Sequence, residues 1–175
     1  MPDPVAVGFR CHSGWAVMVI VRGSSLAPVV LDRRRIDLTS AGLPTQPYHA
    51  VAEGGAARSI IAQVEGSAAE AVRSAVSSVS GVVAVGVVAA DRALPTDLDA
   101  ILRVHARLHA AEGALYENAV IEAGTAAGLA VHVVAPDAIA VSRVVEDLRA
   151  TVGPPWQKDH KWATTAALAA LDSLR

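Results

Sequence analysis

The segment HARLHAAEGALY, residues 105–116, contains the side chains whose types and spacing best suit chemistry. Four polar groups follow one another at intervals of four, three and four residues: His105, His109, Glu112 and Tyr116. On a helix that turns about 100° per residue, they fall within a sector of about 60°. Leucine, isoleucine and alanine residues occupy the same sector, so we expect these polar groups to lie on the buried face of a helix.

This polar stripe is compatible with three roles, and the sequence leaves all three open. His105, His109 and Glu112 have the i, i+4, i+7 spacing that can place three ligands on one metal ion. Glu112 can instead act as a catalytic general base that His109 orients, with His105 and Tyr116 as ligand-binding groups. In a structural network, the carboxylate and the imidazoles would bond to backbone groups or water. Of the two functional roles, we favour the one without a metal.

A second group of candidates lies in GPPWQKDHK, residues 153–161, before a final Ala-rich helix over 162–174. Cationic side chains at a helix N-terminus oppose the helix dipole, which favours negative charge. Lys158, His160 and Lys161, together with free backbone N–H groups, therefore predict a site for an anionic ligand. Trp156 can stack on a base or another ring of that ligand.

Three further parts of the chain contain candidate residues. Arg10 and His12 stand at the end of the first expected strand, and we predict that they bind the ligand. His49 lies at a loop-to-helix junction after a proline, where functional side chains often gather. Arg33 and Arg35 share one face of their strand and form a basic stripe, which is either a phosphate contact or the charged protection of an edge strand.

The hydrophobic pattern predicts the elements that must position these residues. Short apolar runs separated by turns predict strands over 5–11, 15–21, 28–38, 81–90 and 130–136. Ala-rich periodic stretches predict helices over 50–80, 97–127, 137–152 and 162–174, with Gly54, Gly55 and Gly66 bending or interrupting the first. Three antiparallel strands followed by alternating helices and strands predict a five-stranded mixed α/β sheet with helices on both faces.

Composition limits the class of protein. The chain has 175 residues, of which 53% are hydrophobic and 18% charged, enough for one folded domain over 1–175. A net charge of −2 argues against a generally basic nucleic-acid coat but allows a local basic patch. The single cysteine excludes an internal disulfide and a thiolate zinc site. No signal pattern or membrane-length apolar run is visible, so we expect a cytoplasmic protein that does not interact with membranes.

The order of elements resembles the ribonuclease H-like fold and, within it, the RuvC-type Holliday junction resolvases. VAVGFRCHSGWAVMVI resembles the resolvase opening, a strand ending at a catalytic Asp followed by a Gly-bearing turn. KDHKWATTAALAAL resembles the C-terminal motif, in which an acidic pair leads into a helix. The resemblance implies a carboxylate cluster that holds two Mg²⁺ ions.

The expected acids are mostly replaced in this chain. Arg10 stands where the first Asp is expected, and VAVGVVAAD offers only apolar residues before Asp91. Asp159 matches one acid of the C-terminal motif, but Trp162 occupies the place of the other. The cation at position 10 would repel the Mg²⁺ ions that the site needs.

We therefore expect a resolvase-like protein that has lost the usual metal chemistry and needs no cofactor. It would bind nucleic acid, another anionic or phosphorylated ligand, or a protein partner. The alternative is an active hydrolase or nuclease with an altered site built from Asp159, Glu112 and the histidines, in which Mg²⁺ remains possible. The Ala-rich helices also suggest a homodimer.

Overall fold

The computed structural model describes residues 3–175 and opens with an antiparallel meander of three strands. These are β1 (Val5–His12), β2 (Trp15–Ser24) and β3 (Ala27–Asp37). Gly14, with φ of 82°, closes the first turn, so that His12 and Trp15 are paired across it. The strands lie close to their predicted bounds, because apolar runs bounded by glycine turns specify a meander locally.

Two parallel strands extend the sheet beyond β1. These are β4 (Val82–Val88) and β5 (Ala130–Val134). The strand order is β3-β2-β1-β4-β5, with β4 parallel to β1 and β5 parallel to β4. The predicted mixed five-stranded sheet is therefore confirmed.

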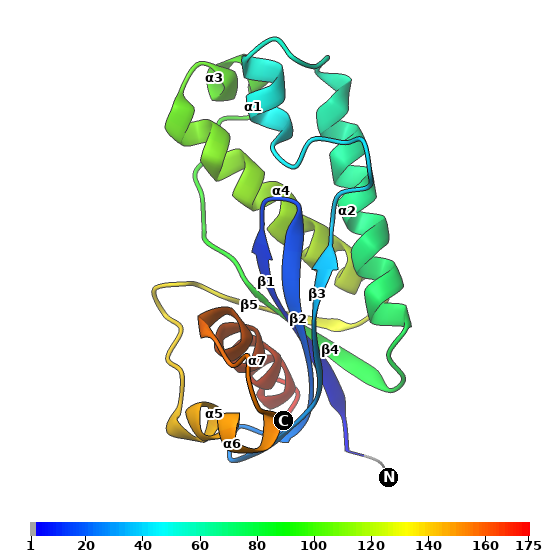
Figure 1. Cartoon of the computed structure of the whole chain (residues 1–175), viewed down its shortest axis with the longest axis vertical. Helices are drawn as coiled ribbons and strands as arrows, with labels where there is room; N and C mark the ends of the chain where they lie inside the picture. Colours follow the sequence, from blue (N-terminus) through cyan, green and yellow to red (C-terminus); the bar gives the residue numbers. More distant parts are fainter. Residues whose placement is uncertain (1–2) are drawn as a thin grey trace.

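Helices cover both faces of this sheet (Figure 1). One face carries α2 (Ser59–Ser77) and α4 (His105–Ala126), with the short helices α1 (Pro47–Ala52) and α3 (Leu98–Leu102) beside the first turns of α4. The other face carries α7 (Lys158–Asp172), with α5 (Arg143–Asp147) and α6 (Arg149–Val152) near it. None of the helices in the described part of the chain is long and apolar enough to cross a membrane.

Three predicted helices are broken differently from the expectation. The stretch 50–80 separates into α1 and α2 around Gly54 and Gly55, whereas Gly66 lies within α2 without interrupting it. The stretch 97–127 divides at Arg103–Val104, and in 137–152 the helix begins only after Ser142, whose hydroxyl accepts from the backbone N–H of Val145. A side-chain cap thus sets the start of the helix after Ser142, whereas α2 and α4 begin without one. The final helix begins at Lys158, before its predicted start.

Two glycines let α7 lie directly on the sheet. A Cβ added at Gly8 of β1 would lie 1.8 Å from the carbonyl oxygen of Ala163, and one at Gly86 of β4 would lie 2.0 Å from that of Ala166. The facing side chains Ala163, Ala166 and Ala167 are fully buried. The small residues on both sides therefore hold α7 close against β1 and β4, and this contact places the start of α7 near the end of β1, at the candidate site.

Candidate functional site

The end of β1 presents two polar side chains toward α7. Successive residues of a strand point to opposite faces. Phe9 and Cys11 are buried in the core beneath α2 and α4, so Arg10 and His12 lie on the α7 face with Gly8. Both side chains are partly exposed, 23% for Arg10 and 32% for His12.

Asp159, in the first turn of α7, joins these two residues. Its Oδ2 lies 2.9 Å from Nε2 of His12, and its Oδ1 lies 3.9 Å from Nε of Arg10. The Arg10 guanidinium also donates to the carbonyl oxygen of Cys11 at 3.0 Å. The structure therefore brings together three of the residues that the sequence predicted, two from β1 and one from α7.

Aromatic and cationic side chains extend this contact in both directions. The rings of His12 and Trp15 stack with centroids 4.2 Å apart, and the Arg35 guanidinium lies 4.3 Å from the centroid of Trp15. On the other side, Lys158 Nζ lies 4.2 Å and the Arg10 guanidinium 5.4 Å from the ring of Trp162. We call the set the cationic–aromatic row: Arg35, Trp15, His12, Asp159, Arg10, Trp162 and Lys158.

The row does not fit a pair of Mg²⁺ ions. Such ions need several oxygen ligands, mainly carboxylates. The neighbour of Arg10 on β4 is Val88, which is fully buried, so no acid stands at that strand end. Asp159 is the one carboxylate of the row, and a guanidinium and an imidazole already face it. Asp91 lies instead in a separate pocket with Arg92 and Glu117.

Three other predicted ligand-binding residues near α7 have structural contacts. Trp156 is only 7% exposed, and its Nε1 donates to the carbonyl oxygen of Val145, so its ring is an anchor beneath α5 and is not presented for stacking. Lys161 forms an ion pair with Glu146 of α5, with Nζ 2.6 Å from Oε2. His160 Nδ1 accepts from the backbone N–H of Gln157 and caps α7.

His160 predicts a pH dependence of stability. Burial, and secondarily the Arg33 guanidinium, lower the pKa of His160 below its ordinary 6.5, against the opposing effect of Asp159. The unfolded chain therefore binds more protons near pH 6, and stability present above pH 6.5 is lost as the pH falls through the folded-state pKa. His160→Gln, which keeps a capping side chain, should reduce the slope of unfolding free energy against pH between about pH 5 and 7. Urea titrations across that range test this, and an unchanged slope would contradict it.

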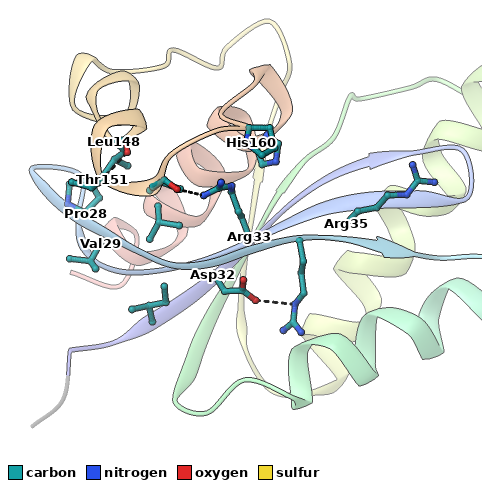
Figure 2. A pocket seen from close by; sticks show the side chains of 13 residues that line it. Pro28, Val29, Asp32, Arg33, Arg35, Leu148, Thr151 and His160 are labelled. Atoms are coloured by element: carbon teal, nitrogen blue, oxygen red, sulfur yellow. Dashed lines mark hydrogen bonds and ion pairs between the residues drawn. The ribbon is translucent and has the colours of Figure 1, made fainter.

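A groove lies between β3 and the α5–α6 segment (Figure 2). Its volume is about 810 Å³, and its lining includes Arg33, Arg35 and His160. Arg33 spans it and donates to the carbonyl oxygens of Val152 and Pro154 at 2.8 and 2.9 Å. The guanidinium of Arg33 therefore holds β3 to the segment after α6. Arg35 lines the same groove and is also a member of the cationic–aromatic row.

The polar stripe of α4 is only half buried, which differs from the expectation. Glu112 and Tyr116 are 1% and 0% exposed, but His105 and His109 are exposed, because the first turns of α4 extend past the sheet (Figure 1). Tyr116 donates its hydroxyl to the carbonyl oxygen of Thr45 at 2.7 Å and packs in the core. It therefore presents no surface to a ligand.

His49 of α1 completes the cluster that the stripe began. Its Nδ1 lies 2.8 Å from Oε1 of Glu112, and its ring centroid lies 5.1 Å from that of His105 and 4.6 Å from that of His109. Within residues 3–175, no hydrogen bond or ion pair joins this cluster to Asp159. The three predicted catalytic residues are therefore divided between two places, Asp159 at the row and Glu112 with His109 beside α1.

Trp15 and Trp162 were not among the predicted site residues, and Arg35 was predicted only as part of a basic stripe with Arg33. Trp15 could have been found from the turn, since a two-residue hairpin pairs it with His12. The contact of Arg35 with Trp15 depends on strand pairing, and that of Trp162 with Arg10 on the packing of α7 against the sheet, so neither contact has a local sequence signal.

The sheet order and the helices on both faces define an α/β protein with a ribonuclease H-like fold, with a row of basic and aromatic residues at the end of its first strand. Two structures of Thermus thermophilus RuvC are similar to this chain. The one in complex with a Holliday junction substrate has a TM-score of 0.57 and 17% identity, over 94% of this chain and 90% of that chain. The other has a TM-score of 0.56 and 16% identity over the same shares.

A PPX-GPPA enzyme of Aquifex aeolicus matches 77% of this chain and 37% of that chain, with a TM-score of 0.36 and 17% identity. No protein-family model and no curated protein matches the sequence. The likeness to RuvC confirms the predicted fold.

Proposed function

We propose that this protein binds nucleic acid through the cationic–aromatic row and does not use two-metal carboxylate chemistry. The observation that carries the proposal is Arg10 at the tip of β1, paired with Asp159 and lying over Trp162. A cation at this position attracts phosphate and repels Mg²⁺. In a resolvase this strand end would hold metal-binding acids. Here it is suited to the phosphate backbone of a nucleic acid.

The row combines aromatic side chains, which suit the bases of a nucleic acid, with cationic side chains, which suit its phosphates. Trp15 and Trp162 are partly exposed, and side chains of the row lie against both rings. A base would stack on either ring by displacing one of these side chains. Arg10, Arg35 and Lys158 supply positive charge for phosphates. Two carboxylates face these cations, Asp159 beside Arg10 and Asp37 beside Arg35. Basic side chains interleaved with aromatic ones are typical of surfaces that bind single strands and unpaired bases.

The likeness to RuvC supports a branched DNA as the first ligand to test. The RuvC of Thermus thermophilus was solved with a Holliday junction substrate, and this chain matches nearly all of that fold. Unstacked bases at a branch point are more accessible to tryptophan than bases within a duplex. We therefore rank a four-way junction and single-stranded DNA above plain duplex.

The alternative, an active hydrolase built from Asp159, Glu112 and the histidines, has weaker support. It needs these groups around one substrate, whereas Asp159 contacts Arg10 and His12, and Glu112 contacts His49. A homodimer and a protein partner stay predictions of the sequence.

Fluorescence anisotropy with labelled four-way junction, single-stranded and duplex DNA tests the proposal. In the presence of a chelator, the junction should bind, and Trp162→Ala should weaken it about tenfold to a hundredfold through lost stacking. Arg10→Gln should also weaken binding and reduce the slope of log affinity against log salt by about one.

Arg73→Ala is the matched control, because Arg73 lies exposed on α2 and, within residues 3–175, its ion-pair partner is Glu70 one turn away. It should bind the junction as the wild type does. Equal losses in Arg73→Ala and Arg10→Gln, or no binding at low salt, would reject the proposal. Cleavage of the junction in Mg²⁺ would reject the absence of two-metal chemistry.

A further inference from the structure

We propose that His49, His105 and His109 bind one Zn²⁺ ion, which fastens α1 to the start of α4. One ring nitrogen from each histidine lies within 4.8 Å of those of the other two. Nε2 of His105 and Nε2 of His109 are 3.0 Å apart. Tetrahedral zinc with bonds of about 2.0–2.1 Å holds its nitrogen ligands about 3.3 Å apart, so small side-chain rotations bring all three onto one ion.

The backbone already places the three rings on one side. His105 and His109 are four residues apart on α4 and therefore lie one above the other on its surface. His49 comes from α1, a separate helix, and its ring meets both of theirs in edge-on or tilted contacts. A ligand contributed by a second element is what distinguishes this cluster from a helical pair of histidines.

Glu112 orients His49 for such a role. Its Oε1 accepts from the backbone N–H of His49 at 3.2 Å and lies 2.8 Å from Nδ1 of the same ring. With Nδ1 donating to the carboxylate, Nε2 is the nitrogen left to bind a metal. Histidine ligands of zinc commonly donate their other ring nitrogen to a carboxylate, which fixes the tautomer and raises the basicity of the ligand.

The burial of Glu112 is a second, independent observation. Its side chain is 1% exposed, its Oε2 has no hydrogen-bond partner, and His49 is its one ion-pair partner in the described part of the chain. A buried carboxylate is costly unless positive charge lies nearby. A Zn²⁺ ion bound to Nε2 of His49 would place positive charge near the carboxylate, on the other side of the imidazole ring.

The donor set favours Zn²⁺ over Mg²⁺ or Ca²⁺. Three imidazole nitrogens suit zinc and its transition-metal neighbours, whereas Mg²⁺ and Ca²⁺ take oxygen ligands. Because His105 and His109 are exposed, the fourth position of the ion would face solvent and accept water. The N-terminal dipole of α4 opposes a cation at His105, but this effect is small beside three coordinate bonds.

Calorimetric titration of the tag-free protein with Zn²⁺ tests the site. The wild type should bind one ion per chain, and His109→Ala should weaken that binding by on the order of a hundredfold or more. Glu112→Gln, which keeps the ligands but removes the carboxylate, should weaken it about tenfold to a hundredfold. His132→Ala removes a histidine on β5 outside the cluster and should bind as the wild type does.

Thermal melting of each variant without metal separates lost binding from lost folding, because the exposed His109 can be replaced with little effect on stability. Zn²⁺ should raise the melting temperature of the wild type and of His132→Ala, but not that of His109→Ala. Absence of saturable binding, or equal binding by His109→Ala and His132→Ala, would overturn the proposal. These measurements contain no nucleic acid, so their outcome is independent of the proposed function.

Discussion

Replacing Arg92 by alanine is expected to lower the free energy of unfolding by about 3–5 kcal/mol. Glu117 of α4 is only 3% exposed, and Arg92 binds both of its carboxylate oxygens, with Nη2 3.0 Å from Oε1. The other donor to Glu117 is the backbone N–H of Ala90 at 3.3 Å. Removal of Arg92 therefore leaves a buried charge without a counterion. Urea unfolding of the variant measures the loss.

Two controls test this explanation. Arg143→Ala breaks an ion pair with Asp147 whose side chains are 91% and 68% exposed, and it should leave the stability almost unchanged. Adding Glu117→Gln to Arg92→Ala should recover a large part of the loss, since a neutral amide costs less to bury than a carboxylate. A double variant as unstable as Arg92→Ala alone would show that lost packing, and not an unpaired charge, causes the effect.

Gly86→Ala is expected to lower the free energy of unfolding by about 3 kcal/mol. The added Cβ would lie 2.0 Å from the carbonyl oxygen and 2.2 Å from the carbonyl carbon of Ala166. Both atoms belong to the backbone of α7, so no side-chain rotation can relieve the clash and the helix must move from the sheet. Because α7 carries Asp159 and Trp162, the displacement should also weaken binding of the four-way junction.

Gly66→Ala is the matched control. A Cβ at Gly66 meets no atom within 4 Å, and the residue lies exposed inside α2. Alanine there should raise the stability by about 0.5–1 kcal/mol through helix propensity alone. Replacing glycine by alanine is therefore expected to lower the free energy of unfolding at position 86 and to raise it at position 66. Similar stabilities for Gly86→Ala and the wild type would mean that α7 does not pack on β4 as the structure shows.

The two candidate sites differ in how far the sequence could predict them. At the cationic–aromatic row, the strand end and the start of the last helix can both be located from local patterns, and a resolvase-like topology brings Arg10, His12 and Asp159 together. Trp15 and Arg35 join them only through strand pairing, because the register between neighbouring strands decides which side chains meet. The charged residues of the row could therefore be predicted to lie together, but its aromatic character could not.

For the histidine cluster, the sequence predicted the residue types but not their surroundings. The spacing of His105, His109 and Glu112 marks a helix face with unusual polarity, but it does not show which half of that face is buried. Which half is buried depends on where α4 extends past the sheet and meets α1 (Figure 1). His49, more than fifty residues earlier in the chain, becomes a neighbour only through that contact.

The sequence by itself determined the meander, the mixed sheet, and a polar end of the first strand in which Arg10 stands where the resemblance implies an acid. These features depend on residue type and short-range periodicity, which each segment carries alone. Only the tertiary structure decided that Trp156 and Tyr116 are buried, that Asp159 and Glu112 belong to different places, and that His49 meets the histidines of α4. Burial and long-range contact arise from the packing of separate elements, and local sequence patterns do not contain them.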